Sequence, residues 1–470
     1  MLTVKTELLK ALAAALEQLA PGAGAKAAFE SPKVAAHGDL ATTAAMQLAK
    51  PLKLNPRQLA EQLRAALMAS PAFAQWVDAV DIAGPGFINI KLKAQAKQQV
   101  VREVLAQAQR FGRQAPTGKR MMVEFVSANP TGPLHVGHGR GAAYGASLSS
   151  LLSFAGWDVT REYYVNDAGR QMDILGLSTW LRYLDQHGVS VPFPPNGYQG
   201  AYVRDMAEQL KHAHGDKYVR TAEAVLAGTP GLPDAARADD EAKQQRELHL
   251  DALIANAKSS LGPDWDYVHQ HALNEQLADC RDDLEQFGVH FDVWFSEKAL
   301  YDTGLVARCV ALLEEKGHIY VQNGAKWFKS TAFGDEKDRV VQRENGLYTY
   351  FASDIAYHLN KFERGFDKVI NIWGADHHGY IPRVTGAIKA LDLDSDKLQV
   401  ALVQFAVLYR NGQKASMSTR SGEFVTLREL RGEVGNDACR FFYALRKSDQ
   451  HLDFDLDLAK SQSNENPVYY

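Results

Sequence analysis

The sequence predicts an α/β fold in which a parallel sheet carries a helical insertion and follows a small α+β domain. Three apolar runs of strand length predict the sheet, at residues 121–126, 157–165 and 368–373. The first run enters a cluster of Ser, Asn, Pro, Thr and Gly, and a Gly- and Ala-rich helical segment then leads to the second run. A strand, a helix and another strand in this order form a crossover unit of a parallel sheet. The expected architecture is therefore Rossmann-like.

Length and charge indicate several domains and no general affinity for polyanions. The chain has 470 residues, 46% of them hydrophobic and 23% charged, with a formal net charge of −4. This length exceeds what one core usually holds, so about two to four domains are expected. The negative charge argues against a protein that coats nucleic acid, so any RNA contact must be local.

Cysteine spacing and hydropathy indicate a cytoplasmic protein with no membrane partner. No apolar run approaches the length of a membrane span, and the first residues show no export signal. Cys280, Cys309 and Cys439 lie far apart, so neither a disulfide framework nor a paired zinc motif is indicated. We expect these cysteines to be buried thiols.

Residues 1–115 form the predicted α+β domain. Apolar residues between positions 4 and 19 follow helical spacing, and Asn55 before Pro56 is the capping pattern that starts another helix. Residues 87–93 alternate as a half-buried strand, and a further helix leads to a Gly-containing linker. The remaining domains are expected at residues 116–400 and 401–470.

The junction between the first strand and its helix is the predicted centre of the chemistry. The first N–H groups of a helix lack intrahelical partners and attract anions, phosphate above all, so this domain should bind a nucleotide. His135 and His138 can face the same side of the opening turn and donate to phosphoryl oxygens. Gly137 between them lets a flat ring approach the backbone. Zinc ligation, or two ordinary satisfied histidines, is the alternative.

The next part of the chain combines an insertion with hairpins. Residues of about 175–290 switch to helical and loop patterns, which indicates an insertion, and residues 292–297 return to strand character. Asn-Gly pairs at 323–324, 345–346 and 411–412 predict tight hairpin turns. The strands expected at these turns are residues 319–321, 347–351 and 405–409.

The third parallel strand enters a second glycine-containing turn. Gly374 and Asp376 follow it directly, and a carboxylate just beyond a parallel strand is well placed to bind ribose hydroxyl groups. Asp376, His377 and His378 could alternatively ligate zinc.

Residues 135–138 resemble the HIGH motif of class I aminoacyl-tRNA synthetases, and the longer stretch 124–140 resembles its form in bacterial arginyl-tRNA synthetases. The resemblance implies a ligase that activates arginine with ATP and Mg²⁺ and transfers it to tRNA. It implies catalytic roles for His135 and His138, and ATP contacts for Gly137, Gly374, Asp376 and His378.

The choice of amino acid depends on carboxylates near strand ends. A guanidinium binds best to a fork of acceptors, and Tyr350 and Asp354 would share a face if a helix begins there. The resemblance implies that Glu297, Tyr350 and Asp354 recognise the guanidinium. It also implies that Asn129 holds the α-amino and carboxylate groups and that Glu124 supports the site. Alternatively, each carboxylate merely pairs with a neighbouring Arg or Lys.

The activating loop departs from the class I pattern Lys-Met-Ser-Lys-Ser. Met417 and Ser418 match it and are expected near ATP, whereas Ser416 and Thr419 occupy the two lysine positions. Positive charge for the leaving pyrophosphate could come from Arg420 or Lys414. A surface loop with no chemical role is the alternative.

The resemblance also assigns roles to the two ends of the chain. It implies that residues 1–115 contact the tRNA elbow, with a docking or dimerisation module as the alternative. Residues 401–470 would hold the activating loop and a connecting helical segment, truncated before the anticodon-binding domain. We expect a monomer. Two rivals remain: a cysteinyl-type relative, whose zinc-binding cysteine is missing here, and a non-catalytic tRNA- or partner-binding relative.

Overall fold

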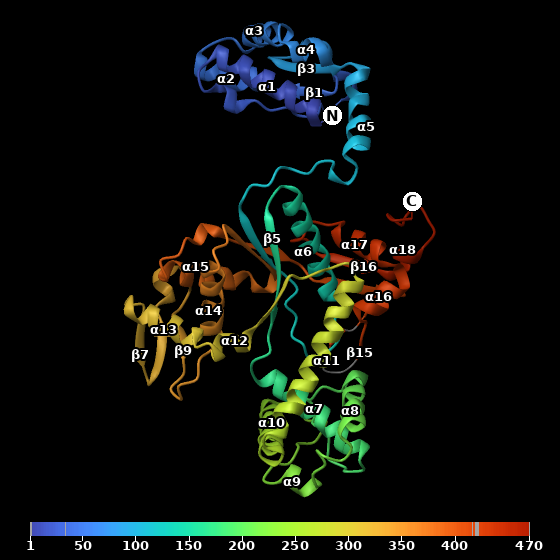
Figure 1. Ribbon diagram of the computed structural model, residues 1–470, viewed down its shortest axis with the longest axis vertical. Helices are drawn as coiled ribbons and strands as arrows, with labels where there is room; N and C mark the ends of the chain where they lie inside the picture. Colours follow the sequence, from blue (N-terminus) through green and yellow to red (C-terminus); the bar gives the residue numbers. More distant parts are fainter. Residues whose placement is uncertain (1, 33, 416, 419–422, 470) are drawn as a thin grey trace. The chain divides into compact units, whose positions relative to one another are not determined.

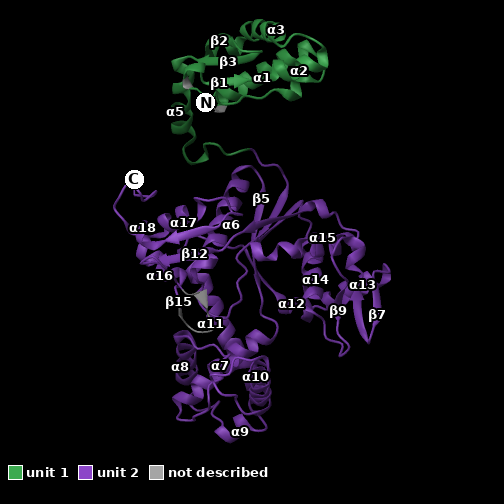
Figure 2. Cartoon of the chain, turned by 180° about the vertical axis from the view of Figure 1, so that it is seen from behind, with its two compact units in different colours: residues 1–114 green, residues 115–470 purple. Residues whose placement is uncertain are grey.

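The computed structural model describes residues 2–32, 34–415, 417–418 and 423–469, and these residues divide into two compact units. Unit 1 spans Met1–Gln114 and unit 2 spans Ala115–Tyr470 (Figure 2). Within the described residues, no helix is both long and apolar enough to cross a membrane. The three cysteines are buried free thiols, as predicted.

Unit 1 packs helices against one antiparallel sheet in which the strand order is β1-β3-β2. Asn55 accepts hydrogen bonds from the amides of Arg57 and Gln58, so α3 begins at Pro56 as its capping pattern predicts. Leu8, Leu63 and Ile90 are fully buried in the core between the helices and the sheet. The elements are α1 (Leu2–Leu19), η1 (Ala23–Lys26), η2 (Ala35–His37), β1 (Leu40–Thr42), α2 (Ala44–Leu52), α3 (Pro56–Met68), α4 (Pro71–Trp76), β2 (Val77–Ala83), β3 (Phe87–Leu92), α5 (Ala94–Gln107) and η3 (Ala108–Arg110).

A parallel sheet organises unit 2, and among the described residues it contains five strands in the order β11-β10-β4-β5-β6. From β4 the chain adds β5 and β6 on one side and later adds β10 and β11 on the other. The strand order therefore reverses between β4 and β10, where open α/β sheets bind ligands. This confirms the predicted fold class. The strands are β4 (Arg120–Glu124), β5 (Asp158–Val165), β6 (Val293–Ser296), β10 (Lys368–Gly374) and β11 (Leu398–Val403).

Helix α6 (Val136–Phe154) lies close to the sheet. A Cβ added at Gly145 would stand 2.3 Å from the ring of Phe125, so only glycine permits this approach. The small side chains of Ala142, Ala143 and Ala146 are also buried against the sheet. The Gly- and Ala-rich composition of this segment thus sets how near α6 comes to β4.

The insertion between β5 and β6 is helical, as predicted, and has its own core. Trp180, Leu253 and Trp265 are buried in it, and α11 then leads back toward the sheet (Figure 1). The helices are α7 (Arg170–Gln186), α8 (Ala201–His214), α9 (Ala222–Leu226), α10 (Asp240–Leu261) and α11 (Asp264–Gln286).

All three Asn-Gly pairs lie at tight turns as predicted: the first and third join two paired strands, and at Asn345-Gly346 the chain reverses with only an isolated antiparallel bridge between Gln342 and Tyr348. Asn323 and Asn411 have φ of 50° and 52°, and each is followed by a glycine with positive φ. The strand expected at residues 347–351 is wrong, because Thr349 caps the amide of Ala352 and starts a helix at Tyr350. The elements from residue 297 to residue 390 are α12 (Glu297–Asp302), α13 (Leu305–Glu315), β7 (Ile319–Gln322), β8 (Ala325–Phe328), η4 (Ser330–Phe333), β9 (Arg339–Gln342), α14 (Tyr350–Glu363), η5 (Ala375–Tyr380) and α15 (Ile381–Ala390).

The last part of unit 2 packs on the same core as α6. Leu408, Leu427 and Leu430 are fully buried there. Strand β11 spans residue 400, where the expected domain boundary lies. The remaining elements are η6 (Ser395–Lys397), β12 (Ala406–Arg410), β13 (Gln413–Lys414), β14 (Met417–Ser418), β15 (Glu423–Phe424), α16 (Leu427–Val434), α17 (Asn436–Ala444), β16 (Leu452–Asp455) and α18 (Leu456–Lys460).

Candidate active site

The two histidines of the opening turn stack on one another at the start of α6. His135 is the N-cap residue, and the ring centroids of His135 and His138 lie 3.8 Å apart. His135 Nδ1 accepts from the amide of Gly137 at 3.1 Å, and His138 Nδ1 accepts from the amide of His135 at 3.3 Å. A Cβ at Gly137 would stand 2.9 Å from the His135 ring, so the glycine makes room for this stack.

Burial sets the charge of both rings, and these hydrogen bonds set which ring nitrogen carries the proton. Burial lowers the pKa of His135 to about 4, and burial together with the neighbouring His135 lowers the pKa of His138 well below its usual value. Both rings are therefore neutral near pH 7. Because each Nδ1 accepts a hydrogen bond, the proton of each ring lies on Nε2. The turn thus presents two neutral N–H donors rather than two cations.

A pocket of about 510 Å³ opens beside this turn at the carboxyl ends of the parallel strands. Its wall contains Gly137 and His138 from α6, Gly374 from the end of β10, and Gln404 and Phe405 after β11. The pocket therefore lies where the strand order reverses. Its shape and its helix N-terminus suit a nucleotide.

Two residues that line this pocket just after β4 have an unusual backbone conformation. Val126 and Ser127 have φ of 66° and 44°, which is the left-handed region, and a β-branched residue rarely adopts it. Ser127 Oγ donates to Glu124 Oε1 at 3.1 Å and accepts from the amide of Tyr164 at 3.1 Å. These bonds hold the strained turn between β4 and α6.

A second pocket of about 470 Å³ shares Val126, Ser127, Trp373 and His377 with the first, so the two pockets adjoin. Asp354 and further polar side chains line it. Glu297 is 2% exposed and accepts from Ser353 Oγ at 3.0 Å. Asp354 accepts a hydrogen bond from the hydroxyl of Tyr380.

Glu297 and Asp354 lack a cation among the contacts of the described residues. With its amide nitrogen turned toward the carboxylate, Asn166 donates to Glu297 Oε2 at 2.7 Å. Burial and the neighbouring Asp354 raise the pKa of Glu297 to about 7. Burial and Glu124 raise the pKa of Asp354 to about 6, against the hydrogen bond from Tyr380. Two close carboxylates with raised pKa values could bind a cationic group.

Glu124 differs from these two carboxylates because it is already paired. Its Oε2 contacts Nζ of Lys361, whose side chain is 0% exposed, and Lys361 also donates to Asn371 Oδ1 at 2.8 Å. Asn371 Nδ2 lies 2.8 Å from His358 Nε2, and His358 Nδ1 lies 2.8 Å from the carbonyl of Asp354. Glu124 thus forms a structural ion pair with a lysine, which is the alternative to a role in arginine binding. Glu124 lines the second pocket, and its partner Lys361 is buried beside it.

The other expected arginine-binding residues lie around these adjoining pockets. Helix α14 begins at Tyr350, so Tyr350 and Asp354 share a face as predicted, and both line the second pocket. Asn129 lines the nucleotide pocket and donates to Gln171 Oε1 at 2.8 Å. Glu297 lines a third, neighbouring pocket together with Tyr350.

Some of the expected ATP-binding and loop residues line the pockets, and others are exposed away from them. Gly374 lines both pockets, and a Cβ there would stand 2.5 Å from Asp376 Oδ1. Asp376 and His378 are exposed, and His377 rather than His378 lines the pockets. Lys414 is exposed on β13. The backbone of Met417 and Ser418 forms β14, whereas Arg420 lies outside the described residues.

Sequence reasoning missed the residues that support the site from a distance. Lys361 is one, and Arg140 is another, because its guanidinium is 1% exposed and donates to the carbonyls of Gln404 and Gln450 at 2.9 and 2.7 Å. The signal for Arg140 was its charge in an otherwise Gly- and Ala-rich helix. Among the described residues, no group of three or more His, Cys, Asp or Glu side chains is placed to hold a metal ion.

The geometry agrees with the comparisons to known proteins. Residues 6–92 match the family model described as the arginyl tRNA synthetase N terminal domain, and residues 100–212 and 262–450 match the class I (R) tRNA synthetase catalytic domain. The chain belongs to the arginyl-tRNA synthetase family.

Two curated relatives of this family show how far the likeness extends. The arginine–tRNA ligase of Dechloromonas aromatica is 77% identical over 469 residues, which cover 99% of this chain and 79% of that protein. The arginine–tRNA ligase of an Azoarcus species is 72% identical, with 99% and 78% covered. The solved Thermus thermophilus arginyl-tRNA synthetase shares the fold, with a TM-score of 0.65, 20% identity, and 98% of this chain and 78% of that one covered.

Arginine is expected to bind more tightly as the pH rises from about 5.5 to 8, because its guanidinium pairs with ionised carboxylates. The raised pKa values of Glu297 and Asp354, about 7 and 6, mean that both ionise only across this range. In the absence of arginine, the same shifts favour the folded state below the unfolded pKa values, and this stability is lost as the pH rises through the folded ones. Calorimetry in two buffers of different ionisation enthalpy should show proton release on binding near pH 6.5. No release would contradict the assignment.

Proposed function

We propose that this chain catalyses the ATP-dependent activation of arginine and its transfer to tRNA. The observation that carries the proposal is a row of adjoining pockets whose two ends differ in chemistry. At one end His138, which stacks on His135, lines the first pocket, and at the other end Asp354 lines the second pocket while Glu297 lines the third, which shares Tyr350 with the second. A phosphate group suits the first end and a guanidinium suits the second. The names of the relatives, arginine–tRNA ligase, support the same reaction.

In the first step, an oxygen of the arginine carboxylate attacks the α-phosphorus of ATP. A new P–O bond forms, the bond to the bridging oxygen breaks, and pyrophosphate leaves. His135 and His138 donate from Nε2 to phosphoryl oxygens as negative charge develops. Because both rings are neutral, they stabilise charge without giving up a proton.

The proposed position of arginine follows from the linings of the second and third pockets, to which Asp354 and Glu297 respectively contribute. Glu297 and Asp354 receive the guanidinium, the ring of Tyr350 covers it, and Asn129 holds the α-amino and carboxylate end near the nucleotide. Glu124 supports the second pocket through its ion pair with Lys361. This arrangement places the two reactants in one orientation, which supplies much of the rate enhancement in such reactions.

ATP would lie with its base and ribose along Gly137, Gly374 and the backbone of Met417 and Ser418, and with Asp376 and His378 at the outer rim. Mg²⁺ would enter with ATP as part of the substrate. None of the described residues that line the nucleotide pocket carries a carboxylate, so phosphate oxygens and water would provide most of the Mg²⁺ ligands. Lys414 and Arg420 are the candidates for charge near the pyrophosphate.

In the second step, the 2′-hydroxyl of the terminal tRNA adenosine attacks the arginyl carbonyl and AMP leaves. Residues 1–115 are proposed to contact the tRNA, which would explain a separate compact unit with its own core. We further propose a monomer that works in the cytoplasm.

Arginine-dependent exchange of pyrophosphate into ATP, measured with and without tRNA, tests the proposal. Arginine should support exchange, whereas citrulline, which has the same shape without the charge, should fail because it leaves both carboxylates unpaired. The variant Glu297→Gln should raise the KM for arginine about a hundredfold, since a charge-assisted pair is lost. The matched control Glu363→Gln, at the far end of α14, should behave like the unchanged protein. Absence of exchange under both conditions in a folded, ATP-binding protein would favour a non-catalytic tRNA-binding relative.

A further inference from the structure

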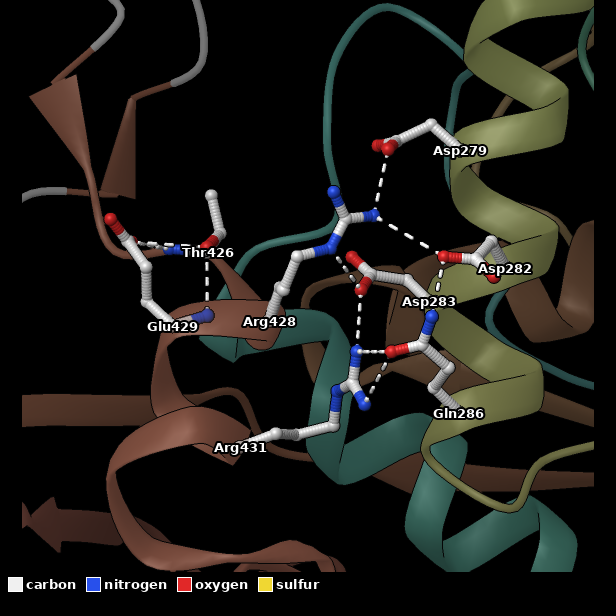
Figure 3. Close-up of polar contacts among 8 residues, drawn as sticks. All are labelled: Asp279, Asp282, Asp283, Gln286, Thr426, Arg428, Glu429 and Arg431. Atoms are coloured by element: carbon white, nitrogen blue, oxygen red, sulfur yellow. Dashed lines mark hydrogen bonds and ion pairs between the residues drawn. The ribbon is translucent and has the colours of Figure 1, made fainter.

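A cluster of charged side chains joins α16 to the end of α11 (Figure 3). Asp283 is fully buried, and its Oδ1 accepts from Arg428 Nε at 3.0 Å and from Arg431 Nη2 at 2.8 Å. Arg428 Nη2 also donates to Asp279 Oδ1 at 2.7 Å, and Arg431 lies within 3.5 Å of Gln286 Oε1. One buried carboxylate therefore holds two guanidinium groups from the same short helix.

Helix α11 makes this cluster more than a local contact, because it belongs to two cores. Trp265 and Val268 near its beginning are buried in the core of the insertion. Cys280 and Leu284 near its end are buried in the core of the parallel sheet. A continuous helix transmits displacement along its axis, so the position of the insertion and the position of the cluster are linked.

The other side of the cluster reaches the histidine turn. The residues just before α16 pair with the residues just before α6, with Thr426 opposite His135. The amide of Leu427 donates to the carbonyl of Leu134 at 2.7 Å, and the amide of Val136 donates to the carbonyl of Val425 at 3.3 Å. Figure 3 shows Thr426 and Glu429 in reciprocal capping bonds on either side of Arg428, so α16 begins where this pairing ends.

From these contacts we infer that Arg428 and Arg431 are positioning residues: by binding Asp283, they hold α16 so that its first residues keep the histidine turn in place. The inference rests on the proposed role of His135 and His138. Neither arginine lines the nucleotide or the arginine pocket. Their effect should therefore reach the reaction through the backbone pairing at Thr426 and not through contact with a substrate.

The variant Arg428→Gln tests the inference, because Arg428 is half-exposed and its replacement should leave the protein folded. The exchange rates of the Val136 and Leu427 amides with deuterium should rise about tenfold, because their hydrogen bonds open more often. The kcat of arginine-dependent pyrophosphate exchange, with tRNA present, should fall about tenfold with the KM for arginine nearly unchanged, since small misplacement of catalytic groups is costly. Arg428→Lys should have a kcat between those of Arg428→Gln and the unchanged protein, because a single ammonium group cannot bind Asp279 and Asp283 at once as the planar guanidinium does.

Arg237→Gln is the matched control. Arg237 is 45% exposed, against 49% for Arg428, and it pairs with two carboxylates, Asp239 and Glu241, where Arg428 pairs with three. This variant should change neither amide exchange nor kcat. Unchanged exchange at Val136 and Leu427 in a folded Arg428→Gln protein would overturn the inference, as would a uniform loss of protection across both helices. If the unchanged protein shows no pyrophosphate exchange, the proposed function fails, whereas the amide rates still decide the inference.

Discussion

Replacing His135 and His138 together by alanine is expected to lower the kcat of arginine activation about a thousandfold or more, because loss of one preorganised donor to a developing charge costs about 10²–10³-fold. The KM for arginine should change little, since the pockets that receive the guanidinium are untouched. Single-turnover formation of the arginyl-adenylate, with labelled ATP, measures the effect.

Two further measurements separate chemistry from structure in this variant. His135 also caps α6, so its loss should reduce thermal stability modestly, by about 1 kcal/mol. His138→Ala keeps the bond from the Gly137 amide to His135 and loses only the bond from the His135 amide to His138, and it should still lose most of the rate. The control His290→Ala removes an exposed histidine paired with Glu285 and should leave the rate unchanged. Adenylate formation at the normal rate in the double variant would refute the role of both rings.

The variant Lys361→Met should destabilise the protein by about 3–5 kcal/mol, because it leaves a buried carboxylate without its cation. The Lys361 side chain is 0% exposed and that of Glu124 is 9% exposed, so water cannot replace the lost partner. Urea denaturation followed by circular dichroism measures the change.

The double variant Lys361→Met with Glu124→Gln should recover part of this loss, since it removes the uncompensated charge. Lys389→Met, on the exposed face of α15, is the control and should lie within about 0.5 kcal/mol of the unchanged protein. Equal stability of Lys361→Met and the control would show that the buried pair contributes nothing.

The sequence was sufficient to predict those helix starts and turns that depend only on neighbouring residues. Asn55 before Pro56 predicted the start of α3, and the Asn-Gly pairs at 323–324 and 411–412 predicted their hairpins, because capping and turn chemistry depend on neighbours in the chain. At residues 347–351, aromatic and branched side chains favoured a strand. The hydroxyl of Thr349 caps the first turn of α14 instead, and burial of its apolar face decides for a helix.

The candidate site was predictable in its motifs but not in its support. The strand-to-helix junctions placed Gly137, His138 and Gly374 around one pocket, because parallel strands bring their carboxyl ends together. The pairing of Glu124 with Lys361 joins residues 237 positions apart, and no local pattern encodes it. The same holds for Asp283 with Arg428, which join the insertion helix to the segment after the activating loop.

The contact between Gly145 and Phe125 also limits how precisely phosphate can be held. A helix tilts as a rigid rod, and seven residues separate Gly145 from His138, which is about 10 Å along the axis. A methyl group added at position 145 would therefore push α6 away from Phe125 and tilt it. A tilt of a few degrees would move the imidazole rings by fractions of an ångström. The orientation of the two imidazole rings thus depends in part on Gly145, which lies outside the substrate pockets.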